Sequence, residues 1–148
     1  MGFQYRLESL LRLQRGLEQQ QENRLLAIAA EIARLRTRLQ EWEQARLHRK
    51  AAVCVDGEAG MSGAVLHLAM EWDRTAAEYQ KAVSKQLAAA ECARLQQLQL
   101  YRAARQKREV LESLREHEQS EYLVDQLHQI QLNLDETFLA HKFYRESS

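Results

Sequence analysis

Residues 24–42, RLLAIAAEIARLRTRLQEW, decide the fold of this chain. Apolar side chains recur in steps of three and four residues, which is the spacing of a helix that buries one seam against another helix. These seam residues are Leu25, Ile28, Ile32, Leu35, Leu39 and Trp42. The residues between them are mostly Ala, Arg, Glu and Gln, which are good helix formers. The stretch therefore predicts one helix of a coiled coil.

The same spacing extends outward in both directions, from Phe3 to Val53, and eleven of the fifteen seam positions are apolar. Its first part is formed by Phe3, Leu7, Leu10, Gln14, Leu17, Gln21 and Leu25. One extra residue in the steps from Leu17 to Leu25 predicts a local relaxation of the supercoil. The chain of 148 residues has no proline, whereas an average chain of this length has about seven. Because proline breaks helices, its absence leaves long stretches uninterrupted.

The seam breaks at residues 56–63, DGEAGMSG, which hold three of the five glycines. Glycine adopts left-handed backbone conformations freely, so we expect a turn at residues 54–63, with Ser62 capping the next helix. The expected helices cover residues 3–53 and 64–145. The sequence thus predicts an all-α fold, a long antiparallel two-helix coiled coil that forms a single helical-hairpin domain over residues 1–148.

The two predicted helices have unequal lengths. If the chain folds back near residue 59, position 36 faces about position 82 and position 3 faces about position 115, at the same rise per residue in both helices. About thirty C-terminal residues then form a helical overhang without an intramolecular partner. This overhang is rich in large apolar residues, among them Leu123, Leu127, Ile130, Leu134, Phe138 and Phe143. Such a helix is unstable alone in water. We expect it to bind a partner; self-association or a frayed tail are the alternatives.

Composition excludes several classes of function. The formal net charge is zero and the pI is about 7.0, so nucleic acid and anionic membrane are not expected partners. Cys54 and Cys92 lie far apart without metal-type or redox-type spacing, which indicates a reduced, intracellular protein. The first residues are polar and no run of 18 apolar residues exists, so we expect a cytoplasmic protein without signal peptide or membrane span.

No motif points to chemistry. The five histidines lack chelating spacing, and no phosphate-binding loop or nucleophile motif is present. We therefore expect no enzyme activity, no catalytic residues, no cofactor and no metal. The carboxylates of the second helix are interpreted as a solvated face or as a docking strip for a basic partner. They are Glu109, Glu112, Glu116, Glu118 and Glu121.

Two tryptophans and two arginines near the turn are candidate binding residues. Trp42 and Trp72 lie on opposite helices at nearly the same level, so they form either a core pair or a partly exposed aromatic anchor. Arg46 and Arg49 occupy seam positions, where burial is costly. They are therefore interpreted either as seam-flanking residues that keep the helix soluble or as a mark of where the hairpin opens toward another protein.

Two terminal blocks resemble the FliJ family of flagellar export proteins. The opening FQYRLESLLRLQRGLEQQQENRLLAIAAEI matches through Phe3, Tyr5, Leu7, Leu10, Leu11, Leu13 and Arg15. The second block, YRAARQKREVLESLREHEQSEYLVDQ followed by LDETF, matches through Arg108, Leu111, Leu114, Arg115, Tyr122, Leu134, Asp135 and Glu136. The segment LVDQLHQIQLNL is more apolar than the family pattern, and the CVDGEAG stretch at the turn is unusual.

The resemblance implies the cytoplasmic stalk of the flagellar type III export apparatus, peripheral to the inner membrane at the flagellar base. Proteins of this family resemble the γ subunit of rotary ATPases, insert into the hexameric export ATPase ring and contact the cytoplasmic domain of the export gate; some bind export chaperones. The implied ring-binding residues are Phe3, Tyr5, Leu7, Leu10, Arg115, Tyr122, Leu127, Ile130, Leu134, Asp135 and Phe138. The implied gate-binding residues are Leu39, Trp42, Arg46, Arg49, Trp72, Ala76 and Tyr79. The alternatives are the corresponding stalk of a virulence-type secretion system and a generic coiled-coil scaffold.

Overall fold

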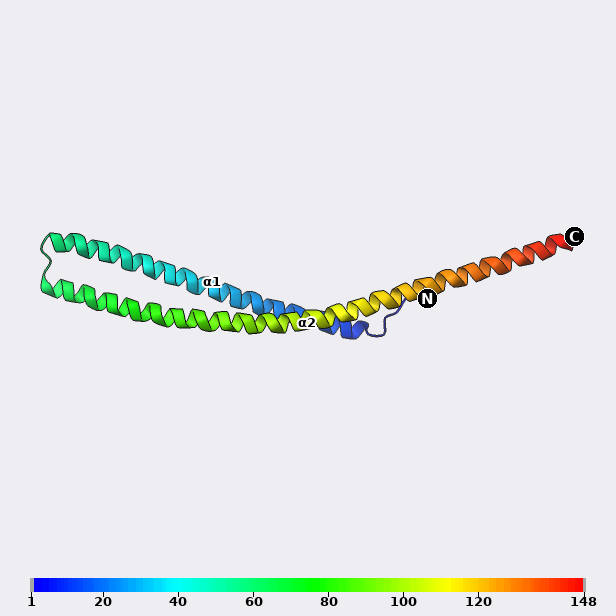
Figure 1. The fold of residues 1–148 in the computed structure, drawn as a ribbon, viewed down its shortest axis with the longest axis horizontal. Helices are drawn as coiled ribbons and strands as arrows, with labels where there is room; N and C mark the ends of the chain where they lie inside the picture. Colours follow the sequence, from blue (N-terminus) through cyan, green and yellow to red (C-terminus); the bar gives the residue numbers. More distant parts are fainter. Residues whose placement is uncertain (1, 148) are drawn as a thin grey trace. The chain divides into compact units, whose positions relative to one another are not determined.

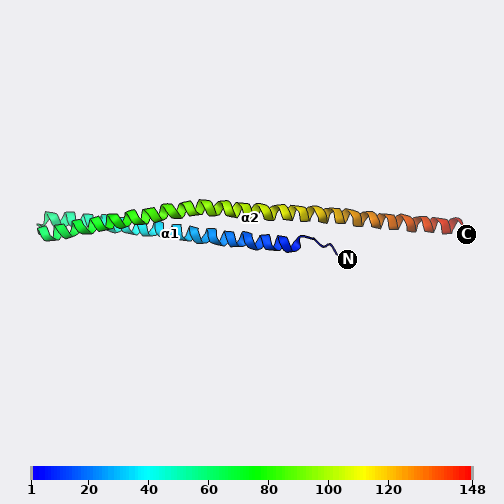
Figure 2. The same ribbon diagram turned by 90° about the horizontal axis from the view of Figure 1, so that it is seen from below.

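The structure, a computed structural model, describes residues 2–147. It consists of two long helices, α1 (Glu8–Glu58) and α2 (Gly63–Glu146), with no strand among the described residues. The two helices pack against each other side by side (Figures 1 and 2). The predicted all-α helical hairpin is confirmed. The chain divides into two compact units: a turn unit from Gln20 to Arg102, and a terminal unit of the residues up to Gln19 together with those from Ala103 onward.

The turn is shorter than predicted. Helix α1 continues through Gly57 to Glu58, five residues beyond the expected end at residue 53. The chain leaves the helix at Gly60, which has a φ of 90° and so adopts the left-handed backbone that glycine permits. Helix α2 then begins at Gly63, and the Val65 amide donates to the Ser62 hydroxyl at 3.4 Å. The predicted Ser62 cap is confirmed.

The N-terminal residues precede α1 instead of belonging to it, so the predicted helix start at Phe3 is wrong. Tyr5 is buried, and its hydroxyl donates to the backbone carbonyl of Leu111 at 2.9 Å. The amide of Glu8 donates in turn to the Tyr5 carbonyl at 3.2 Å. These bonds hold the segment against α2 and place the first helical turn at Glu8.

The seam of α1 is regular, and the predicted extra residue is wrong. The buried and half-buried seam positions are Leu11, Gln14, Glu18, Gln21, Leu25, Ile28, Ile32, Leu35, Leu39, Trp42, Arg46 and Val53. Leu7, Leu10 and Leu17, which were expected in the seam, are 38–40% exposed. Glu18 faces α2 in place of Leu17 because its carboxylate pairs with Arg108.

The turn unit has a narrow apolar core with one polar layer. Its buried residues include Ile32, Leu35, Ala76 and Val83. The polar layer is Gln97, whose buried amide donates to the backbone carbonyl of Gln21 at 3.2 Å. Such a bond removes most of the desolvation cost of a polar group in the seam.

The pairing register lies close to the expected one. Gln97 bonds to the Gln21 backbone at the expected position, and the Tyr5 hydroxyl bonds to the Leu111 carbonyl two residues from it. Arg36 reaches past position 82 to pair with Glu91 at 2.9 Å, because both side chains are long. Phe3 lies against Tyr122 instead of position 115, because the chain before Glu8 is not helical and advances further per residue.

Candidate partner-binding surfaces

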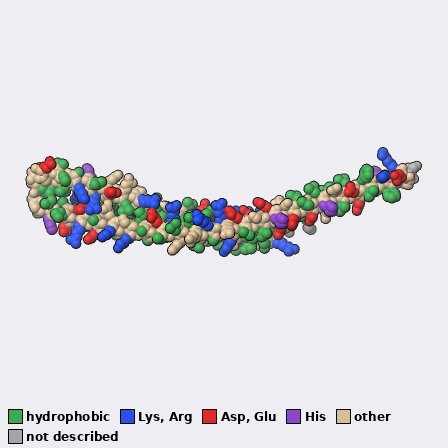
Figure 3. Space-filling view, viewed as in Figure 1, with side chains coloured by type: hydrophobic (Ala, Val, Ile, Leu, Met, Phe, Trp, Pro, Cys, Tyr) green, Lys and Arg blue, Asp and Glu red, His purple; other side chains and the backbone are tan. Residues whose placement is uncertain are grey.

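The C-terminal part of α2, residues 123–146, is exposed along its whole length. We call this segment the overhang; it is the tail that extends beyond the N-terminus in Figure 2, and hydrophobic side chains cover much of it in Figure 3. Four expected ring-binding residues lie on it with half to two-thirds of their surface exposed: Leu127, Ile130, Leu134 and Phe138. Asp135 is exposed there as well. The predicted overhang is confirmed, although it begins at residue 123.

The apolar side chains of the overhang form two stripes. Leu123, Leu127, Ile130, Leu134 and Phe138 fall within a sector of about 80° around the helix axis, at 3.6 residues per turn. Leu132, Leu139 and Phe143 lie on the opposite side, about 160° away. The carboxylates Glu121, Asp125, Asp135, Glu136 and Glu146 share that second side. One face is thus apolar and free of carboxylates, with His141 and Arg145 at its C-terminal end, and the other is apolar and acidic.

The remaining expected ring-binding residues form the packed base of the terminal unit. The rings of Phe3 and Tyr122 lie 5.7 Å apart, and Arg115 pairs with Glu8 at 3.4 Å. Tyr5 is buried and therefore unavailable to a partner as placed. Leu7 and Leu10 are about two-fifths exposed. The expected set is therefore divided between an exposed overhang and a base that mainly holds the helices together.

An ion-pair network that was not expected from the sequence crosses this base. Arg108 pairs with both Glu18 and Glu112, and Arg15 pairs with Glu112 at 3.0 Å. Burial raises the pKa of the Glu112 carboxyl, but hydrogen bonds from Arg15 and Arg108 outweigh burial and hold the pKa below its ordinary value. Glu112 is thus committed to internal pairs, which contradicts its place in a docking strip. Counting back from Leu25 in regular steps of four and three residues leads to Gln21 and then to Glu18, so the spacing in the sequence indicated this residue.

Replacing Arg108 by leucine is expected to destabilise the chain by about 2 kcal/mol. Charged hydrogen bonds contribute about 1.5–3 kcal/mol, and partial exposure places this network toward the lower end. The measurement is urea unfolding followed by circular dichroism. Arg105→Leu is the matched control, because Arg105 pairs with Glu109 on the same helix with both side chains at least half exposed. An equal loss in both variants would contradict a structural role for the network.

An aromatic cluster lies in the turn unit and brings most of the expected gate-binding residues together. Trp42 stacks on Trp72 with ring centroids 6.3 Å apart, and Tyr79 lies 4.6 Å from Trp42. All three rings are half-buried, so the expectation that the tryptophans share a level is confirmed. Leu39 is half-buried in the seam and Ala76 is only 2% exposed. Ala76 is therefore excluded from direct partner contact.

The two arginines beside this cluster differ in their surroundings. Arg46 is half-buried and makes two hydrogen bonds to the Asp73 carboxylate, at 2.7 and 3.2 Å, and one to Gln80 at 2.8 Å. Arg49 is exposed and its guanidinium lies 4.2 Å from the centroid of the Trp72 ring, as a cation–π contact. Arg46 therefore ties the helices together, whereas Arg49 is available to a partner.

The Arg46–Asp73 pair predicts a pH dependence of stability. The hydrogen bonds from Arg46 hold the pKa of the Asp73 carboxyl below its ordinary 3.8. A lowered folded-state pKa stabilises the fold above the unfolded-state value, and this contribution is lost as the pH falls through the folded-state pKa. We expect the Tm of Asp73→Asn to lie below that of the parent chain at neutral pH, with the difference shrinking below pH 3.8. A difference in Tm that is constant with pH would contradict the pairing.

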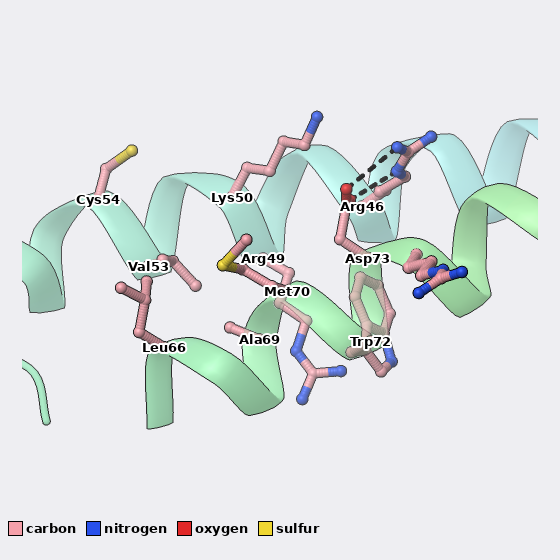
Figure 4. Close-up of a pocket in the computed structure, with 11 residues that line it drawn as sticks. Arg46, Arg49, Lys50, Val53, Cys54, Leu66, Ala69, Met70, Trp72 and Asp73 are labelled. Carbon is pink, nitrogen blue, oxygen red and sulfur yellow. Dashed lines mark hydrogen bonds and ion pairs between the residues drawn. The ribbon is translucent and has the colours of Figure 1, made fainter. Parts of the chain in front are cut away.

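A groove opens next to the aromatic cluster, between the last turns of α1 and the first turns of α2 (Figure 4). Its volume is about 390 Å³. The lining residues are Arg46, Arg49, Lys50, Val53, Cys54, Leu66, Ala69, Met70, Trp72, Asp73 and Arg74. Val53 and Leu66 point toward each other from the two helices in Figure 4. This groove was not among the surfaces expected from the sequence.

No protein-family model matches the chain, and no curated protein or solved structure matches it. Within residues 2–147, no helix combines the length and apolarity that a membrane span requires. The described residues also contain no group of three or more His, Cys, Asp or Glu side chains placed to hold a metal ion. Cys54 and Cys92 are exposed free thiols.

Proposed function

We propose that this chain is the cytoplasmic stalk of a flagellar type III export apparatus, which inserts into the hexameric export ATPase ring and links the ring to the export gate. The observation that carries the proposal is the overhang, an exposed helix of residues 123–146 with large apolar side chains along it. An apolar helix surface of this extent is unfavourable in water, so it is expected to be covered in the working assembly.

The placement of the two stripes favours a ring over a single partner helix. One helix packs against one side of another helix, through a seam that covers a limited sector. The overhang has apolar side chains on opposite sides, so the partner that covers it has to contact both sides. The lining of a ring contacts an inserted helix from all sides. The resemblance of both terminal blocks to the flagellar stalk family supports the same assignment.

The proposed gate contact involves the exposed parts of the aromatic cluster. Arg49 and the half-buried rings of Trp42, Trp72 and Tyr79 are accessible, and tryptophan and arginine are enriched in binding hot spots. Arg46, Leu39 and Ala76 support this surface from within the hairpin. In this proposal the chain has no chemistry of its own, and it reaches the inner membrane only through the gate and, in some systems, export chaperones.

The proposal is tested by mixing the full chain with a hexameric flagellar export ATPase. We expect co-purification at one copy per six ATPase subunits and an increase in ATP hydrolysis. A parallel mixture with the ATPase of a virulence-type system separates the two kinds of stalk, because the cognate ring should be stimulated more strongly. Absence of binding to either ATPase would overturn the proposal.

A self-associating scaffold is the second candidate, and the same exposed overhang favours it. Such a scaffold would form oligomers by itself, through the overhang, at micromolar concentration. Sedimentation of the isolated chain distinguishes the two functions: a stalk remains a monomer until the ATPase is added, whereas a scaffold sediments as an oligomer.

A further inference from the structure

The groove beside the turn has features of a peptide-binding site. It lies in the turn unit, about 390 Å³ in volume, and is walled by α1 on one side and α2 on the other. From these features we infer that the groove binds an acidic amphipathic helix of a partner protein. The groove shares Arg49 and Trp72 with the proposed gate-binding surface, but the inference does not depend on the overhang or on ring binding.

The charge of the groove defines the chemistry of the partner. Four basic residues line it, Arg46, Arg49, Lys50 and Arg74, against one carboxylate, Asp73. Asp73 is neutralised by its two hydrogen bonds with Arg46. The remaining basic side chains stand on both walls; Lys50 is attracted by the same Asp73 carboxylate, Arg74 lies 3.8 Å from Glu78, and the lining keeps an excess of positive charge. A partner with Asp or Glu on both flanks complements this arrangement.

The floor of the groove defines the other face of the partner. It is made by Val53, Leu66, Ala69, Met70 and the ring of Trp72. Leu66 and Met70 are 45% and 64% exposed, which is high for side chains beside a helix–helix seam. A third helix that inserts apolar residues at steps of three and four would cover them and extend the hairpin to three helices at this level.

An anionic membrane surface is the other ligand that basic and apolar side chains attract. Two observations favour the peptide. The last turn of α1 carries exposed Asp56 and Glu58, which would meet an anionic bilayer first and be repelled. The basic residues also flank a groove instead of forming one flat face, because Lys50 comes from α1 and Arg74 from α2.

The test uses the full chain with a fluorophore that reports on the groove. Cys54 lines the groove and is exposed, so a polarity-sensitive dye is attached there in a Cys92→Ser background. The control carries the dye at Cys92 in a Cys54→Ser background. The probes are a synthetic amphipathic peptide of about 18 residues with leucines at helical spacing and flanking glutamates, the same peptide with lysines for glutamates, and vesicles containing phosphatidylserine.

We expect the acidic peptide to change the emission of the Cys54 dye and not of the Cys92 dye, with an affinity that weakens as salt is added. A groove variant that reverses three basic charges, Arg49→Glu, Lys50→Glu and Arg74→Glu, should bind the acidic peptide at least tenfold more weakly. The same variant should bind the lysine peptide more tightly than the parent chain does. The control triple variant changes Lys81, Lys85 and Arg94 to glutamate, since these are exposed basic residues of the same unit outside the groove. Circular dichroism verifies that both variants are helical.

Three results would overturn the inference. The first is an equal response of the Cys54 dye to both peptides in the parent chain, which requires no variant. The second is an equal loss of affinity for the acidic peptide in the groove triple variant and in the control triple variant. The third is a response of the Cys54 dye to vesicles but not to the acidic peptide, which would indicate a membrane surface.

Discussion

Replacing Leu127, Ile130 and Leu134 together by serine is expected to abolish stimulation of the export ATPase while the hairpin stays folded. The three side chains are 66%, 52% and 64% exposed in the isolated chain, so they contribute little to its folding. In the complex, each substitution removes about 1.5 kcal/mol of favourable burial free energy, the lower end for an aliphatic side chain. Three such losses, about 4.5 kcal/mol, weaken the affinity by at least about 1,000-fold. The measurements are ATP hydrolysis against stalk concentration and thermal unfolding of each variant.

The matched control changes three exposed leucines of the turn unit to serine: Leu26, Leu95 and Leu100, which are 53–63% exposed. It removes the same amount of apolar surface, and we expect full stimulation. A truncation after Tyr122 removes the whole overhang and leaves the contact between Phe3 and Tyr122 in place. If either overhang variant stimulated like the parent chain, the overhang would not be the ring-binding element.

The fold was predictable where the seam is apolar. From Leu25 to Trp42 each seam position is a large apolar residue, so hydrophobic spacing alone finds the buried face. Toward the N-terminus the seam contains Gln14, Glu18 and Gln21, and hydrophobicity then selects the neighbouring leucines, such as Leu17. Only the partner helix decides between the two faces, because Arg108 and Gln97 supply the bonds that make polar seam residues acceptable.

The end of α1 was not predictable for a related reason. Glycine inside a helix costs about 1 kcal/mol, which argues for a break at Gly57. The helix nevertheless continues to Glu58. The positive φ appears only at Gly60. Which of the three glycines ends α1 depends on where α2 begins to pack against it. Residue spacing in a single sequence does not determine that position.

The overhang and the groove also differ in how far the sequence predicts them. The overhang follows from unequal helix lengths, which can be counted along the sequence. The groove depends on how the seam is filled near the turn. Arg49 occupies a seam position by spacing, yet it lies over the Trp72 ring instead of between the helices. The available signal was the pair of seam arginines before the turn together with the mostly apolar stretch from Val65 to Met70 after it.

The aromatic cluster is expected to show the largest single-residue effect on stability. Trp42→Ala should reduce the free energy of unfolding by about 3 kcal/mol, the lower end for a tryptophan truncation, because the ring is half-buried and not fully enclosed. Its contacts are the stacked ring of Trp72 and the tilted ring of Tyr79. Leu47→Ala, on the same helix at 62% exposure, is the control and should change stability by less than about 0.5 kcal/mol.

A double-mutant cycle with Trp72→Ala separates the ring–ring contact from the loss of buried area. We expect a coupling free energy of about 1 kcal/mol, as for other aromatic pairs in contact. Urea unfolding of the parent, both single variants and the double variant gives the coupling directly. A coupling near zero with an unchanged Tm for Trp42→Ala would mean that the pair contributes nothing to the hairpin. In that case the two tryptophans would serve a partner instead of the fold, and the affinity of Trp42→Ala for the export gate should fall more than tenfold.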